Sequence, residues 1–144
     1  MVEKLKKELI LALKEKDAVK VSTLRMLLSE VKNDQIDKPD FNDADFIGVV
    51  FKSAKKRKES IAAFKKAGRV DLVEKEEKEL DILSKYLPQQ MNAQELEKIV
   101  REAVDEMGAS SMADFGKVMG NIMQKVKGKA DGDDVQMAVK QALS

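Results

Sequence analysis

The chain has 144 residues and a net charge of +1, which is enough for one ordinary domain or two small ones and gives no overall field that would attract nucleic acid or a membrane. It contains no cysteine and no histidine, which excludes disulfides and thiolate zinc sites and removes the commonest general base and metal ligand. Charged residues make up 37% and aromatic residues 4%. This composition favours amphipathic helices over a β-sandwich, so we expect an all-α protein without a metal or cofactor.

Four helices are predicted in the first part of the chain, because apolar residues recur there every three or four positions. The segments are residues 2–16, a second one that ends near 34, residues 43–67 and residues 72–86. Asn42 or Asp43 is placed to cap the third helix, Gly68 to end it and Asp71 to cap the fourth. We expect these helices to bury their apolar stripes together as a bundle.

The segment LPQQMNAQ is the best candidate for a domain boundary, because Pro88 ends a helix and Asn92 with Glu95 forms a new capping box. Three helices are expected beyond it: residues 93–107, one that opens at Ser111, and one that opens at Asp131 and ends at Leu143. We therefore predict an N-terminal four-helix unit over 1–89 and a small three-helix unit over 90–144.

The amino-terminal segment MVEKLKKELILALKEKD has its longest apolar run at Leu9 to Leu13. This run is too short for a signal core or a membrane span. We expect a cytosolic protein that has no membrane partner.

Two glycines stand inside a predicted helix in GKVMGNIMQKVKGKADG, although each helical glycine costs about 1 kcal/mol relative to alanine. Gly116 and Gly120 lie between the apolar face of this helix and its polar face. The polar face and the following loop carry Lys117, Asn121, Gln124, Lys125, Lys127 and Lys129. Two interpretations stay open: the glycines admit another helix, or they admit a nucleic-acid backbone beside the lysines.

The strongest basic cluster lies in KSAKKRKES, and residues 52–69 hold eight basic residues and one acid. On a helical wheel Lys52, Lys55 and Lys56 face away from the apolar stripe. The cluster is either a solvated face or a surface that binds phosphates.

Arg57 is the exception in this cluster, because it falls on the apolar side of its helix. Glu76 and Glu79 lie among or beside apolar residues of the next helix. An unpaired buried charge is costly, so we predict a structural ion pair between Arg57 and these two carboxylates. Arg25, at the edge of the second helix, is an alternative partner for the same groups.

The blocks LPQQ, GKVMG and KVKGKADG, in this order, resemble the GatB/YqeY family, and the resemblance covers essentially the whole chain. The chain looks like a stand-alone YqeY-like member. A related domain forms the helical tail of the B subunit of the glutamine-dependent aminoacyl-tRNA amidotransferase. The resemblance implies a helical N-terminal unit and a small three-helix unit that recognises tRNA, as that tail does.

The family is associated with carbon–nitrogen ligase activity that uses glutamine as the amido donor. In the B subunit the catalytic part lies upstream of the tail, and 144 residues leave no room for it. The resemblance therefore does not assign this activity to the chain alone.

Three functions stay open after the sequence analysis. The leading hypothesis is a non-catalytic helical module that binds tRNA, or works beside tRNA-dependent amidation, and does not bind DNA. The alternative is a module that docks on an amidotransferase or an aminoacyl-tRNA synthetase without touching RNA. The third is an enzyme that uses carboxylate or lysine chemistry.

Overall fold

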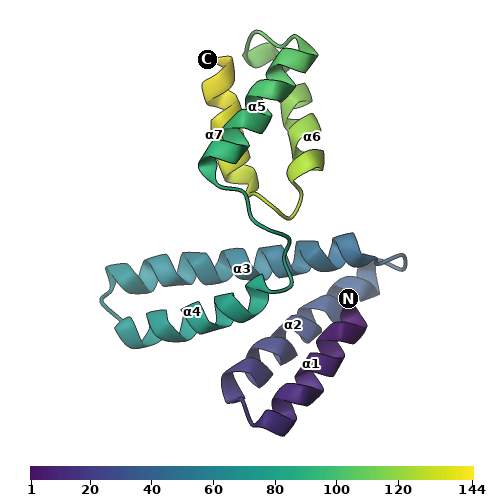
Figure 1. The fold of residues 1–144 in the computed structure, drawn as a ribbon, viewed down its shortest axis with the longest axis vertical. Helices are drawn as coiled ribbons and strands as arrows, with labels where there is room; N and C mark the ends of the chain where they lie inside the picture. The colour runs from purple at the N-terminus through teal and green to yellow at the C-terminus, as the bar shows by residue number, and fades with distance from the viewer. The chain divides into compact units, whose positions relative to one another are not determined.

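The computed structural model describes residues 1–144 and contains helices and loops but no β-strand (Figure 1). This confirms the predicted all-α class. None of the helices is both long enough and apolar enough to span a bilayer. The helices are α1 (Val2–Glu15), α2 (Ala18–Asp37), α3 (Asp43–Lys66), α4 (Val70–Ser84), α5 (Ala93–Met107), the 3-10 helix η1 (Met112–Asp114), α6 (Phe115–Val126) and α7 (Gly132–Leu143).

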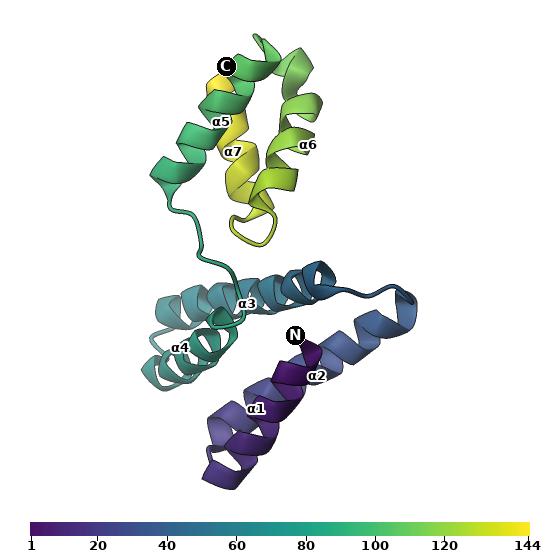
Figure 2. The same ribbon diagram turned by 45° about the vertical axis from the view of Figure 1, so that its right-hand side comes forward.

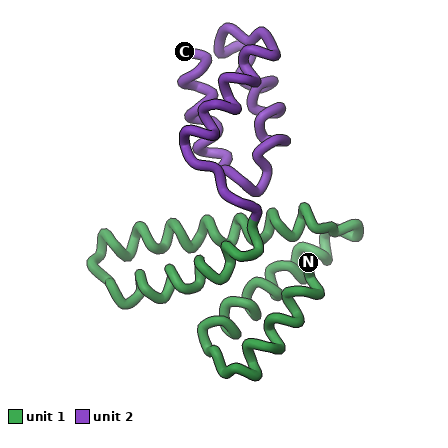
Figure 3. The backbone as a smooth tube through the Cα atoms, in the orientation of Figure 1, with its two compact units in different colours: residues 1–87 green, residues 88–144 purple.

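The chain divides into two compact units, unit 1 over Met1–Leu87 and unit 2 over Pro88–Ser144 (Figure 3). Unit 1 holds α1 to α4, and unit 2 holds α5 to α7. Separate folding of these units as domains with limits at 1–89 and 90–144 stays a prediction.

Unit 1 consists of two helical hairpins, α1 with α2 and α3 with α4 (Figures 1 and 2). Helix α2 also contacts both helices of the second hairpin. The hairpins share one core, because leucines of α1 and α2 pack in the same cluster as residues of α3 and the end of α4. Its buried members are Leu5, Ala12, Leu24, Leu27, Val31, Phe46, Val50, Leu83 and Tyr86.

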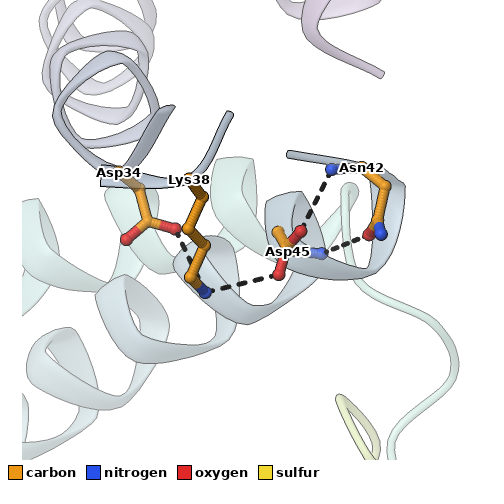
Figure 4. Close-up of polar contacts among 4 residues, drawn as sticks. All are labelled: Asp34, Lys38, Asn42 and Asp45. Atoms are coloured by element: carbon orange, nitrogen blue, oxygen red, sulfur yellow. Dashed lines mark hydrogen bonds and ion pairs between the residues drawn. The ribbon is translucent and has the colours of Figure 1, made fainter. Parts of the chain in front are cut away.

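A polar network fixes the turn between α2 and α3 (Figure 4). Lys38 Nζ lies 3.3 Å from Asp45 Oδ1 and 3.8 Å from Asp34 Oδ2. Asn42 and Asp45 form a capping box at the start of α3, so Asn42 rather than Asp43 is the cap of the two that the sequence offered. The hydrogen bond to Asp45, with the negative charge of Asp34, raises the pKa of Lys38.

Tyr86 connects the end of α4 to α1. Its hydroxyl donates a hydrogen bond to Glu8 Oε2, and its ring meets Phe46 edge to face with 6.0 Å between centroids. Lys4 Nζ lies 5.8 Å from the ring centroid. Burial and the Glu8 carboxylate hold the pKa of Tyr86 well above its usual value, so it stays neutral.

The start of α4 differs from the sequence prediction. The helix begins at Val70 after Arg69, and no side chain caps it. Asp71 lies in the first turn and forms an ion pair with Arg69 at 3.4 Å, so the prediction that it is the cap is wrong. The hydrogen bond from Arg69 lowers the pKa of Asp71. A first-turn carboxylate still favours the helix, because it faces the positive end of the helix dipole.

Arg57 lies between α3 and α4 with its side chain 15% exposed. Its Nε is 3.1 Å from Glu79 Oε2 and 3.5 Å from Glu76 Oε2. Its Nη2 donates to Met26 Sδ of α2 at 2.8 Å. The predicted pairing is therefore present, and Arg25 takes no part in it. One guanidinium thus connects three helices of unit 1.

Two carboxylates share this single cation. Burial and the neighbouring Glu79 raise the pKa of Glu76, and the attraction of Arg57 offsets this only in part. Glu76 Oε2 is buried and accepts no hydrogen bond. Glu79 is the better placed partner, because it is closer to Arg57 and only 9% of its side chain is exposed.

Unit 2 has its own core, to which each of its three α-helices contributes three residues. Asn92 and Glu95 form the predicted capping box at the start of α5. Gly108 ends that helix with φ +62°. The core residues are Leu96, Val100, Ala103, Val118, Ile122, Val126, Val135, Val139 and Leu143.

Replacement of Arg57 by alanine is expected to destabilise unit 1 by about 3 kcal/mol, because two carboxylates lose their buried cation. Lys58→Ala, at an exposed position of the same helix, should change the free energy of unfolding by about 0.5 kcal/mol or less. Urea unfolding followed by the fluorescence of Tyr86, the single tyrosine, measures both. Equal unfolding midpoints for the two variants would contradict the structural role of Arg57.

Glu76→Gln is expected to stabilise unit 1 increasingly as the pH rises from about 4.5 to 7. A raised carboxyl pKa in the folded state means that folding favours the protonated form of Glu76. The stability that this group contributes is therefore fully present below the pKa of 4.5 in the unfolded chain, and it is lost as the pH rises through the pKa in the folded chain. The glutamine side chain is uncharged at every pH, so the variant does not lose this stability. The difference in urea midpoint between variant and wild type should therefore grow with pH, whereas Asp81→Asn, at an exposed position, should give no such trend. A pH-independent difference for Glu76→Gln would refute the assignment.

Candidate nucleic-acid interface

Helix α6 is positioned by a short turn at its start and by an apolar face. Ser111 accepts a hydrogen bond from the Ala113 amide and opens η1, after which the chain continues into α6. Val118, Ile122 and Val126 are fully buried in the core of unit 2. Because these residues fix the rotation of the helix, its opposite side faces solvent.

Gly116 and Gly120 are exposed on α6. A Cβ atom added to either glycine would meet no atom within 4 Å. No helix of unit 2 therefore packs against them, and close packing inside the unit does not explain their presence. They leave a stretch of helix backbone that a bound molecule can approach closely.

Four lysines lie beside or just beyond these glycines. Lys117, Lys127 and Lys129 are exposed, and none of them forms an ion pair. Lys125 Nζ lies 3.8 Å from Glu106 Oε2, but both side chains are mostly exposed, at 45% and 69%. An exposed pair of this kind is worth little and exchanges easily for a phosphate. All four ammonium groups are thus available to an anionic ligand.

Asn121 does not share this exposure. Its side chain is partly buried, and its Oδ1 has no hydrogen-bond partner within the chain. It lies at the border between the core and the exposed face, and it contributes less to the surface than the sequence suggested.

The loop after α6 is held by the segment that precedes α5. Gln90 Nε2 donates to the carbonyl of Gly128 at 2.8 Å, and the Met91 amide donates to the carbonyl of Lys129 at 2.9 Å. Gly128 adopts φ +79°, a conformation that favours glycine. The loop backbone is thus fixed at two successive residues, and the side chains of Lys127 and Lys129 beside Gly128 are exposed.

Sequence reasoning missed the role of Gln90 and Met91. In the sequence, the block LPQQ indicates only a domain boundary and a family resemblance. A backbone amide that pairs with a loop 38 residues later leaves no pattern in one sequence. LPQQ and KVKGKADG both belong to the blocks that carry the family resemblance, and this is the single feature of the sequence that connects the two segments.

The second predicted cluster belongs to the other unit. Lys52 and Lys56 are exposed on α3, and Lys55 is partly buried there. They therefore belong to a different unit from the lysines of α6.

Methionines divide into two groups in unit 2. Met119 and Met123 pack against the core, as expected for gap-filling side chains. Three others remain largely exposed: Met107 at 40%, Met112 at 47% and Met137 at 61%. They provide adaptable apolar surface on unit 2.

Comparison with known proteins assigns the chain to a family. The model of the family described as YqeY-like protein matches residues 2–143. The chain belongs to the YqeY-like family. The match includes residues of both units.

Three relatives illustrate the range of YqeY-like sequences. The protein named altered inheritance of mitochondria protein 41, mitochondrial, from Vanderwaltozyma polyspora is 36% identical over 131 residues, which cover 84% of this chain and 70% of that protein. Its namesake from Pyrenophora tritici-repentis is 28% identical over 147 residues, 99% of this chain and 81% of that protein. A subunit of glutamyl-tRNA(Gln) amidotransferase from Thermococcus sibiricus is 32% identical over 130 residues, 88% of this chain and 20% of that subunit.

The names of the first two relatives contradict the cytosolic location expected from the sequence, because both are called mitochondrial. The expectation rested on the shortness of the apolar run at Leu9 to Leu13. Such a run argues against secretion and membrane insertion. It carries no information that separates the cytosol from an organelle, and for that reason the inference was wrong.

Gly116→Ala and Gly120→Ala are each expected to raise the stability of unit 2 by up to about 1 kcal/mol, because alanine favours the helix and its Cβ meets open space. Gly108→Ala should instead destabilise, because a Cβ is strained at φ +62°. Amide hydrogen exchange of buried α5 and α7 residues in the full chain measures all three. Destabilisation by Gly120→Ala would show that the glycine has a packing role in the free protein.

Proposed function

We propose that the chain is a non-catalytic helical module that binds tRNA through the outer face of α6 and the loop after it. The residues that carry this function are Gly116, Lys117, Gly120, Asn121, Lys125, Lys127 and Lys129. Asn121 has a minor part at the edge of this surface.

One observation carries the proposal: two helix glycines are exposed with open space above them, beside four available lysines. Glycine weakens an exposed helix, and nothing within unit 2 compensates for that loss. A ligand that must approach the backbone closely gives the glycines a use. Lysine ammonium groups and an open backbone fit the phosphates of RNA, and phosphate contacts position a nucleic acid without reading its sequence.

The relation to an amidotransferase subunit supports tRNA as the RNA. The matching subunit from Thermococcus sibiricus has tRNA in its name, and the matched part is only 20% of that subunit. We infer that this chain corresponds to an accessory region that handles tRNA beside tRNA-dependent amidation. The mitochondrial names of other relatives support a mitochondrial setting for this role.

The alternative function is docking on an amidotransferase or an aminoacyl-tRNA synthetase without RNA contact. The exposed methionines of unit 2 favour it, since flexible apolar side chains suit a protein partner. Capture of partners with and without ribonuclease treatment distinguishes the two: a partner that survives digestion supports docking, and one that is lost supports RNA binding.

Exchange of Lys125 and Lys127 for glutamate is expected to abolish retention of tRNA in a low-salt gel shift. Wild-type binding should be modest and should fall steeply with salt, because four lysines neutralise only a few phosphates. The matched control is Lys98→Glu with Lys140→Glu, which makes the same charge change at exposed positions of α5 and α7. Equal binding by the Lys125/Lys127 variant and wild type, or no tRNA retention by wild type, would refute the RNA surface.

Gly120→Ala adds a second test of the same surface. It is expected to weaken tRNA binding although it stabilises the free helix, because the added methyl group blocks close approach. Circular dichroism should confirm intact helix content in each variant.

A further inference from the structure

A second surface in the molecule, on α3, combines an exposed helix glycine with exposed lysines, as the outer face of α6 does. Helix α3 presents Gly48, Lys52, Lys56 and Lys66 on its solvent side, opposite the buried Phe46 and Val50. At 1.5 Å per residue, Gly48 and Lys66 are about 27 Å apart along the helix. The four positions form a straight stripe, which we call the α3 stripe.

The lysines of the α3 stripe are free of internal partners. No ion pair involves Lys52, Lys56 or Lys66, whereas Lys65 beside them pairs with Glu77 at 3.8 Å. Only Glu59 interrupts the stripe with a negative charge. The stripe therefore has three positive charges against one negative charge, in a chain that is almost neutral overall.

Gly48 gives the α3 stripe an open backbone. It is exposed inside a helix, and an added Cβ would meet no atom within 4 Å. As on α6, a helix-weakening residue stands where the fold has no need of it, next to available lysines. The two units thus repeat one combination on surfaces that are separate in sequence.

We propose that the α3 stripe is a second contact for the RNA backbone, so that the two units grip one tRNA molecule through two tethered surfaces. This inference rests on the proposed function of α6. The ligand is the sugar–phosphate backbone, because the stripe offers ammonium groups but lacks exposed aromatic rings on which bases would stack.

The connection between the units makes such a grip effective. Only residues 88–90 separate the end of unit 1 from Met91, which is fixed to the lysine loop. Three or four residues of extended chain span no more than about 14 Å. Once one surface is bound, the second remains at a high effective concentration near the same RNA, whatever the orientation of the units.

The extent of the amidotransferase similarity agrees with this inference. The match to the Thermococcus sibiricus subunit includes 88% of this chain, which is far more than unit 2 alone. The region shared with a tRNA-dependent enzyme therefore includes unit 1.

The test compares full-length variants that each lose two positive charges. Lys52→Gln with Lys56→Gln removes the centre of the α3 stripe, Lys125→Gln with Lys127→Gln weakens the α6 surface, and Lys75→Gln with Lys78→Gln is the control on exposed positions of α4. Titration of each with tRNA over a range of salt concentrations gives the affinity, the salt dependence and the stoichiometry, and circular dichroism checks the fold.

The expected result is that the Lys52/Lys56 variant binds tRNA about tenfold more weakly than wild type at low salt. Its plot of log affinity against log salt should be shallower by about 1.5, since two phosphate contacts are lost. The Lys125/Lys127 variant should behave similarly, the Lys75/Lys78 control should match wild type, and wild type should bind one tRNA per chain.

Three results would overturn the inference, and only the third of them also refutes the proposed function. If only the Lys125/Lys127 variant loses affinity, α6 is the RNA surface and unit 1 does not contact RNA. If wild type binds two tRNA molecules and the Lys52/Lys56 variant binds one with undiminished affinity, the surfaces act separately. If neither pair of substitutions changes binding, or wild type binds no tRNA, the proposed function fails as well.

Discussion

The contact of Arg57 with Glu79, Glu76 and Met26 determines how unit 1 presents its surface. A guanidinium inside a helical hairpin has one acceptable orientation, toward the carboxylates that neutralise it. Together with the buried Phe46 and Val50, this orientation defines the inward side of α3. Lys52 and Lys56 lie on the opposite side of α3 and are exposed, so the residues that hold the unit together and the residues that form its exterior lie on two sides of one helix.

In unit 2, too, the residues that stabilise the fold are different from those on the exposed face. Three buried residues of α6 hold the helix, and two hydrogen bonds from the segment before α5 hold its loop. The exposed glycines contribute nothing to either. Part of the intrinsic stability of the unit is given up at the positions where a ligand would need room, which is a common relation between stability and function.

The sequence was a good guide wherever one local rule acts alone. The capping box at Asn92 and the charge of Arg57 on an apolar helix face each predicted a feature that the structure contains, and Asn42 is one of the two residues predicted to cap α3. It failed at Asp71, because a carboxylate at the start of a helix can equally be a cap or a first-turn residue. The exposure of Gly116 and Gly120 was undetermined, since a wheel places a residue on a shoulder without saying what lies above it. The Gln90 contact joins segments far apart in the chain, and no periodicity encodes it.

The hydrogen bonds from Gln90 and Met91 to the lysine loop also have a mechanical consequence. They attach the loop to the two residues directly before Asn92, the cap of α5, so tension in the linker acts on Gly128 and Lys129 as well as on the start of α5. Hydrogen bonds loaded in this way give way earlier than a packed core does. The lysine loop is therefore mechanically coupled to the linker through two hydrogen bonds, whereas the three helices are held by a packed core.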